Sequence, residues 1–254
     1  MQKTCFIDGM SNESKKGKKQ TIIAEKGNIY EYIASRINDI NAFEQQAMKW
    51  KEMKNGSALK EIDAAKKYSW FADVVKDIKP QLNRKDVAEY YKNDLYKGFI
   101  ATLLWGGSHT NHVNNFRRLA STPREKVVEK LKNELECLNN NSLNICICFK
   151  KMYRGGINHI SGLGVSFFTK IFYFSRLAHF HQRDLYILDT KLWNALKAFD
   201  KVHNICKKYS VDRCTPLDYT RYCQYITNIS SVRDSGNLEA YLYDHNYDIK
   251  EFIK

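Results

Sequence analysis

The residues best suited to chemistry lie between Ile157 and Leu196. Two glycines separated by one residue, in Ser161-Gly162-Leu163-Gly164, precede an apolar stretch that predicts a helix from Val165. Glycine adopts left-handed backbone angles, and a helix that follows it presents free N–H groups and its positive end. The pattern indicates either an anion site with phosphate as its natural ligand, or a tight turn between two helices with no ligand.

An acidic residue, Asp189, follows Gly164 by twenty-five residues and comes directly after the apolar run Tyr186-Ile187-Leu188. A helix is predicted to start at this position, so Asp189 is expected to act as a helix N-cap. A capping carboxylate can also face a cleft, and the two interpretations are compatible. Lys170 lies four residues after Ser166 and therefore shares a helix face with it.

The composition indicates a folded protein that binds a polyanion. The chain has 254 residues, 41 lysines and arginines against 28 aspartates and glutamates, and a net charge of +13. Hydrophobic residues make up 43%, which excludes a disordered or fibrous chain and allows a sizeable core. The surplus of cations favours nucleic acid as a partner, although a solvated basic surface would give the same count.

The seven cysteines contain no C-x-x-C pair, which is typical of a reduced, cytoplasmic protein. Each is expected to be a small buried hydrophobe, and neither a metal site nor an iron–sulfur cluster is expected. The longest apolar run, Gly98–Gly107, is about half as long as a bilayer-spanning helix. We therefore expect no contact with a membrane. We also expect the protein to be a monomer.

Apolar periodicity predicts helices along most of the chain, and the fold class is all-α. The expected helices cover residues 28–54, 57–77, 84–105, 122–138, 143–152, 157–160, 165–177, 189–209, 216–229 and 237–243. Short extended pieces are expected at 21–24 and 185–188. A polar loop follows Trp105 and holds His109 and Asn111.

Two parts of the sequence together resemble the helix-hairpin-helix superfamily of DNA glycosylases. These are Ile160-Ser161-Gly162-Leu163-Gly164-Val165-Ser166 and Ile187-Leu188-Asp189. More narrowly, the run from Gly162 to Lys170, with Tyr173-Phe174 and Leu188-Asp189, is similar to a bacterial group of 8-oxoguanine-glycosylase-fold proteins. The specific match covers roughly forty residues, and the outer helices agree only in general pattern.

The resemblance implies a two-lobed helical protein that bends duplex DNA and flips a nucleotide into a cleft. Residues 1–83 would complete one lobe, 84–188 would form the central lobe with the helix-hairpin-helix at 157–178, and 189–254 would pack on the N-terminal part. Asp189 would be the catalytic carboxylate, stabilising the oxocarbenium-like sugar and orienting the attacking water. No cofactor is implied, apart from a monovalent cation at the hairpin.

The sequence departs from the bifunctional members of the superfamily at the Schiff-base lysine, because Ser166 occupies that position. Lys170, one turn later, is either an amine nucleophile or a structural partner of Asp189 or of a phosphate. Ser161, Gly162, Gly164 and Ser166 are the expected DNA contacts of the hairpin. His109 and Asn111 would fill the gap left by the flipped base, or they belong to an ordinary surface loop.

The hypothesis is therefore a DNA glycosylase that acts on double-stranded DNA and leaves an abasic site, with weak lyase activity through Lys170 as an option. Its role would be base excision repair or defence against phage DNA with modified bases. The alternative is a non-catalytic helix-hairpin-helix DNA-binding module. In either case we expect the basic side chains to be concentrated on the side of the cleft.

Overall fold

The computed structural model describes residues 29–46, 69–106, 118–119, 122–140, 145–179, 185–199, 210–230, 235–245, 249 and 252. Within these ranges the regular structure is helical and no strand is present, which confirms the all-α fold class. The helices are α1 (Ile29–Ser35), α2 (Ile37–Ala42), α4 (Ser69–Lys76), α5 (Arg84–Asn93), α6 (Leu95–Trp105), α9 (Arg124–Asn140), α10 (Ile145–Met152), α11 (Val165–His179), α12 (Thr190–Phe199), the 3-10 turn η3 (Val211–Arg213), α13 (Pro216–Ile229) and α14 (Ser235–Asp244). None of the described helices is both long and apolar enough to cross a bilayer.

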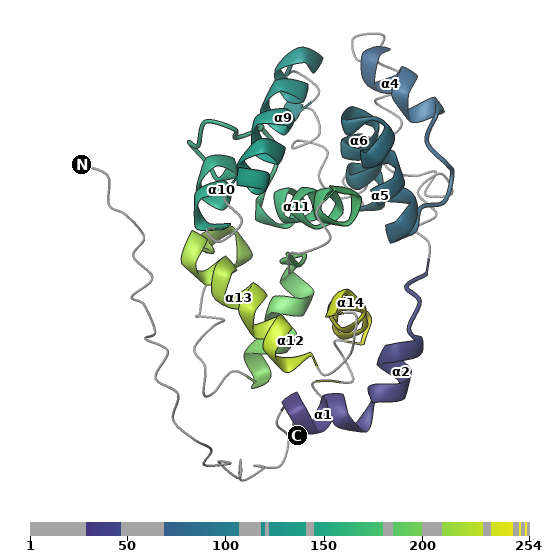
Figure 1. Cartoon of the computed structure of the whole chain (residues 1–254), viewed down its shortest axis with the longest axis vertical. Helices are drawn as coiled ribbons and strands as arrows, with labels where there is room; N and C mark the ends of the chain where they lie inside the picture. The colour runs from purple at the N-terminus through teal and green to yellow at the C-terminus, as the bar shows by residue number, and fades with distance from the viewer. Residues whose placement is uncertain are drawn as a thin grey trace, which may run out of the picture.

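Helix α11 is the central element of the fold (Figure 1). It packs against α5, α6 and η3, while α10 contacts both α9 and α13. At the other end of the molecule α14 packs against α12, α13 and α2, so the C-terminal helices meet the N-terminal ones. The aromatic residues of α11 are buried, as expected of a helix that is apolar on nearly all sides.

The predicted helix over 84–105 is wrong in one respect, because the structure divides it at Asp94 into α5 and α6. The Asp94 carboxylate accepts hydrogen bonds from the N–H groups of Tyr96 and Lys97, at 2.8 and 3.0 Å, and caps α6. Gly98 then lets α6 approach α5, since a Cβ there would meet the Tyr91 ring at 2.5 Å. Apolar periodicity misses this break because only one residue separates the two helices.

The predicted short helix at 157–160 is also wrong, because residues 157–158 form a turn and residues 159–160 have no regular secondary structure. The helix that precedes the hairpin is α10, which ends at Met152. The connection to α11 contains two glycines with positive φ, Gly155 at +83° and Gly162 at +90°. The hairpin therefore has a longer turn region than the sequence indicates, although α11 begins at Val165 as predicted.

Candidate active site

Lys170 and Asp189 lie together at the wall of a cavity. Lys170 Nζ is 3.8 Å from Asp189 Oδ2, and both side chains are mostly buried. Asp189 Oδ1 accepts a hydrogen bond of 2.8 Å from the N–H of Lys191. One carboxylate oxygen therefore caps the start of α12, and the other faces the lysine, so Asp189 combines the two roles considered for it.

Buried hydroxyl groups hold the segment that carries Asp189. Tyr219 and Tyr222 on α13 donate to the carbonyls of Tyr186 and Ile187, at 2.9 and 2.7 Å. Thr169 Oγ1 on α11 accepts the N–H of Leu188 at 3.1 Å. Residues 185–189 have no regular secondary structure, so these bonds satisfy polar backbone groups that no strand partner reaches. They fix Asp189 relative to α11.

The Lys170 amine is enclosed by its own helix and by the end of α6. Its Nζ donates to the carbonyl of Ser166 at 3.1 Å and lies 5.1 Å from the centre of the Phe167 ring. A Cβ at Gly106 would meet Phe167 at 2.9 Å and the Lys170 stem at 3.3 Å, so glycine is required for this close approach. Burial lowers the pKa of Lys170, although the charges of Asp189 and Glu239 oppose this shift.

A second ion pair, Arg84 with Glu239, forms another part of the cavity wall. Arg84 donates to Glu239 Oε2 at 2.6 Å and, through Nε, to Gln45 Oε1 at 2.7 Å. The guanidinium also lies 4.8 Å from the ring centre of Tyr173 and 5.4 Å from that of Trp105. Burial raises the pKa of Glu239, and the neighbouring Arg84 charge opposes the shift. Because 155 residues separate Arg84 from Glu239, no local motif could have indicated this pair.

The cavity has a volume of about 100 Å³. It is lined by Gln45, Gln46, Arg84, Trp105, Gly106, Lys170, Ile187, Asp189, Glu239 and Tyr243. Burial, with the Asp189 charge next, raises the pKa of Tyr243 to about 12, so this phenol stays protonated at neutral pH. The cavity thus combines amide, phenol and ionic groups with one aromatic wall, which suits a planar polar ligand.

The hairpin lies in a second, larger and slightly more open cleft of about 440 Å³. Its lining consists of Arg118, Tyr153, Arg154, His159, Ser161, Gly162, Leu163, Gly164, Val165, Phe168 and Asp212. The first turn of α11 lines this cleft and Lys170, on its second turn, lines the cavity described above. One helix therefore connects the hairpin cleft with the cavity.

The predicted site residues are distributed over these two hollows. The structure brings Asp189 and Lys170 together in the cavity, and it places Ser161, Gly162 and Gly164 in the hairpin cleft. Ser166 lies between them, half-buried, and its carbonyl holds the Lys170 amine. His109 and Asn111 lie outside the described residues.

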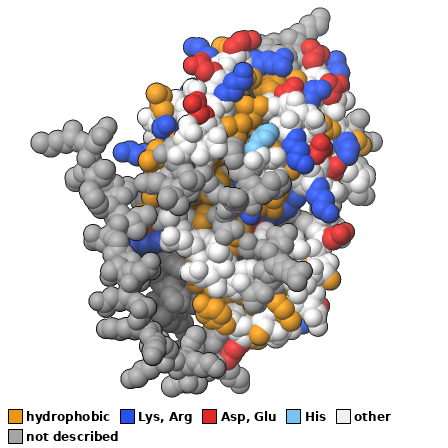
Figure 2. Space-filling model, viewed as in Figure 1, with side chains coloured by type: hydrophobic (Ala, Val, Ile, Leu, Met, Phe, Trp, Pro, Cys, Tyr) orange, Lys and Arg blue, Asp and Glu red, His pale blue; other side chains and the backbone are white. Residues whose placement is uncertain are grey.

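On the face shown in Figure 2, basic side chains lie over the upper and middle parts of the molecule, with acidic ones among them. The lower part of this face carries few charged groups. The charge on this face is therefore uneven. In the hairpin cleft two arginines, Arg118 and Arg154, accompany one carboxylate, Asp212.

A family model described as "Putative 8-oxoguanine DNA glycosylase OGG-like protein" matches residues 41–243. The chain belongs to this OGG-like glycosylase family. The matched range includes every residue that lines the cavity, from Gln45 to Tyr243, and every residue that lines the hairpin cleft. Membership confirms the resemblance that the hairpin and Asp189 indicated, and it implies that DNA is a ligand. Searches of curated proteins and of solved structures gave no match.

Proposed function

We propose that the protein is a DNA glycosylase that extrudes a damaged or modified base from duplex DNA into the cavity and hydrolyses its N-glycosidic bond. The observation that carries this proposal is the pair of Lys170 Nζ and Asp189 Oδ2, 3.8 Å apart at the wall of the cavity, with both side chains mostly buried. Extrusion is required because the bond to be cleaved is otherwise inside the stacked duplex.

Asp189 would stabilise the charge that develops on the sugar. When the bond from C1′ to the base breaks, its electron pair leaves with the base and C1′ becomes cationic. A carboxylate in a site with little water interacts strongly with such a charge. Water then adds to C1′ and gives up a proton, which Asp189 accepts. The departing base takes up a proton from solvent, and the abasic site remains.

Lys170 adds a second route to the same bond cleavage. Burial lowers its pKa, so a larger fraction of the amine is neutral than for an exposed lysine at the same pH. Its lone pair would attack C1′ while the base leaves, and opening of the sugar ring would give a Schiff base. This intermediate permits elimination of the 3′ phosphate, which is lyase activity.

The hairpin cleft would hold the phosphate backbone while the base occupies the cavity. Gly162 and Gly164 allow the DNA strand to approach the backbone closely, and the start of α11 offers N–H groups to a phosphate. A monovalent cation at the hairpin would add a further bridge to the phosphate. Base excision repair and defence against phage DNA with modified bases are both consistent with this chemistry.

The proposal is tested by measuring free bases released from damaged DNA and from phage DNA with modified bases, using mass spectrometry. We expect one class of base to be released by the wild-type protein and to be released far more slowly by Asp189→Asn. Undiminished release by Asp189→Asn would contradict the proposed role of the carboxylate. The alternative, a non-catalytic DNA-binding module, is favoured by the hairpin cleft alone, and it predicts salt-dependent binding without release of any base.

A further inference from the structure

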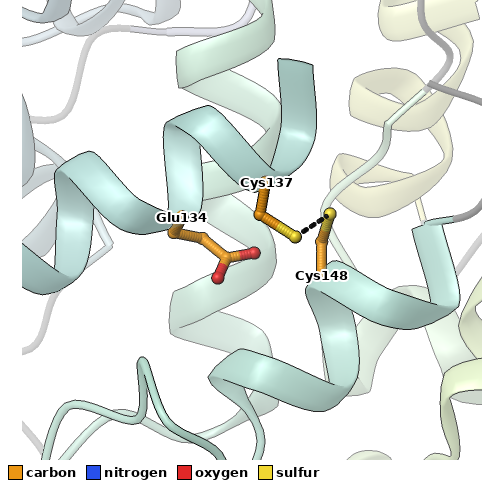
Figure 3. Close-up of side chains that lie close together, drawn as sticks. All are labelled: Glu134, Cys137 and Cys148. Atoms are coloured by element: carbon orange, nitrogen blue, oxygen red, sulfur yellow. Dashed lines mark hydrogen bonds between the residues drawn. The ribbon is translucent and has the colours of Figure 1, made fainter. Parts of the chain in front are cut away.

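Three potential metal ligands converge in the core between α9 and α10, and none of them lines the cavity or the hairpin cleft. They are Glu134, Cys137 and Cys148, all buried, and their ligand atoms lie within 4.8 Å of one another (Figure 3). Glu134 and Cys137 are three residues apart on α9 and so share a helix face, while Cys148 comes from α10. The sequence does not indicate this cluster, because its members form no C-x-x-C motif.

The Glu134 carboxylate is the informative member of the cluster. Its side chain is only 1% exposed, yet Oε1 has no hydrogen-bond partner. Oε2 accepts a hydrogen bond of 2.8 Å from Asn158 Nδ2, which fixes the carboxylate in place. Burying a carboxylate oxygen without a hydrogen-bond donor costs free energy of folding, and a bound cation is one way to offset that cost.

We propose that Glu134, Cys137 and Cys148 bind a thiophilic divalent cation of the zinc class. Two thiolates and one carboxylate are common zinc ligands, and they leave the fourth position of a tetrahedral site for water or for the second carboxylate oxygen. Asn158 would then orient the carboxylate from behind, as partners of metal ligands commonly do. Binding would release the thiol protons to solvent.

The distances require a small adjustment for this ion. Cys137 Sγ and Cys148 Sγ lie 2.8 Å apart, whereas two zinc–sulfur bonds of about 2.3 Å at a tetrahedral angle separate the sulfurs by roughly 3.8 Å. Rotation about χ1 of the two buried cysteines would have to supply this shift. The competing product, a disulfide, needs the sulfurs at about 2.0 Å and leaves Glu134 Oε1 unpaired. The cation satisfies all three groups.

The ion would link the elements on which the hairpin depends. Cys148 lies on the helix that precedes the hairpin, and Asn158 lies in the turn region that follows this helix. An ion at this point would connect α9, α10 and the turn region. The site is therefore structural, at a distance from the proposed chemistry, and its existence does not depend on the proposed function.

The test is metal uptake by the full-length chain under reducing conditions. We expect purified protein to contain about one equivalent of zinc. After removal of that ion, titration with Co²⁺ should give a thiolate-to-cobalt charge-transfer band. Cys137→Ser and Cys148→Ser should abolish the band, and Glu134→Gln, which keeps the size of the side chain, should weaken Co²⁺ binding by at least ~10-fold.

Cys223→Ser is the matched control, because Cys223 is a buried cysteine of α13 outside the cluster. It should bind Co²⁺ as the wild-type protein does. A folded, reduced wild-type chain that takes up neither Zn²⁺ nor Co²⁺ overturns the proposal, whether or not the two cysteines later oxidise to a disulfide. Equal loss of binding in Cys223→Ser also overturns it, since the ion would then lie elsewhere.

Discussion

At the scale of single residues, the two carboxylate oxygens of Asp189 have different partners. Oδ1 accepts the hydrogen bond that caps α12, and Oδ2 faces Lys170 at the wall of the cavity. Asparagine caps a helix about as well as aspartate, so Asp189→Asn should keep the start of α12 intact. The variant loses the negative charge that would stabilise the sugar cation. We expect base release to fall by ~100- to 1000-fold with little change in Tm.

Single-turnover kinetics together with thermal melting check this prediction. Asp189→Ala is the useful comparison, because it removes the cap as well as the charge. It should show the same kinetic loss and an additional loss of about 1 kcal/mol in stability. If the two variants lost stability equally, the capping role assigned to Oδ1 would be wrong.

The reactivity of Lys170 should depend on pH in a defined direction. Because burial lowers its pKa below the ordinary value of 10.5, the neutral amine appears at lower pH than for an exposed lysine. Borohydride trapping of a covalent protein–DNA adduct should therefore increase with pH, with a midpoint below 10.5. Lys170→Gln should give no adduct. An adduct that persists in this variant would assign the Schiff base to another amine.

The sequence identifies part of the site at this scale. Asp189 and Lys170 could be predicted because they lie close to the hairpin in the chain and belong to a recognisable pattern. Arg84 and Glu239 could not, since their pairing depends on how α5 and α14 meet in the folded molecule. Long-range pairing of buried charges has no local signature in a single sequence.

At the scale of elements, Thr169 couples α11 to the segment that carries Asp189. Its hydroxyl donates to the carbonyl of Val165 at 2.9 Å and accepts the N–H of Leu188 at 3.1 Å. Thr169→Val keeps the shape but leaves this buried N–H without a partner. We expect a loss of about 1–3 kcal/mol in stability and a lower rate of base release.

Thr169→Ser is the matched control for this prediction, because it keeps the hydroxyl. Chemical denaturation and single-turnover kinetics on both variants separate the hydrogen bond from the methyl group. Serine should retain most of the activity. A serine variant as slow as the valine variant would show that packing, rather than the hydrogen bond, positions Asp189.

The turn region of the hairpin offers a pair of glycines for comparison. Gly162 and Gly155 both have positive φ, at +90° and +83°, so alanine at either position should cost about 1–2 kcal/mol. Of these two glycines, only Gly162 lines the hairpin cleft. Gly162→Ala should weaken binding of duplex DNA, whereas Gly155→Ala should lower stability alone, as fluorescence anisotropy and thermal melting can measure. Equal loss of affinity in both variants would contradict a direct role for the hairpin.

The helices themselves are largely predictable from apolar periodicity. The predicted helix over 28–54 is wrong, however, because the structure divides it into α1 and α2 and residues 43–46 are not helical. Two further exceptions have local causes. Asp94 ends α5 and caps α6 without disturbing the apolar spacing, so the break is invisible to the periodicity. The segment 157–160 carries a buried residue, Ile160, which helical spacing also explains. Periodicity reports which side chains are buried, and it does not report how the backbone between them is paired.

At the scale of the whole molecule, the net charge of +13 should attract the phosphates of DNA regardless of the base sequence. Binding that releases counterions weakens linearly with the logarithm of salt concentration, by a slope of about −0.9 for each neutralised phosphate. In the Asp189→Asn background, in which turnover should be far slower, duplex binding should therefore have a steep salt dependence. The slope of this salt dependence then gives the approximate number of phosphates that the protein contacts.

Arg154 is exposed in the hairpin cleft, and its removal should make the slope shallower by about 1. Lys92→Ala removes an equally charged side chain from α5, where Lys92 pairs with Glu89, and serves as the control for net charge alone. If the two substitutions changed the slope equally, the +13 charge would act as a diffuse field. A larger effect of Arg154 would locate the phosphate contacts at the hairpin, next to the cavity proposed to receive the base.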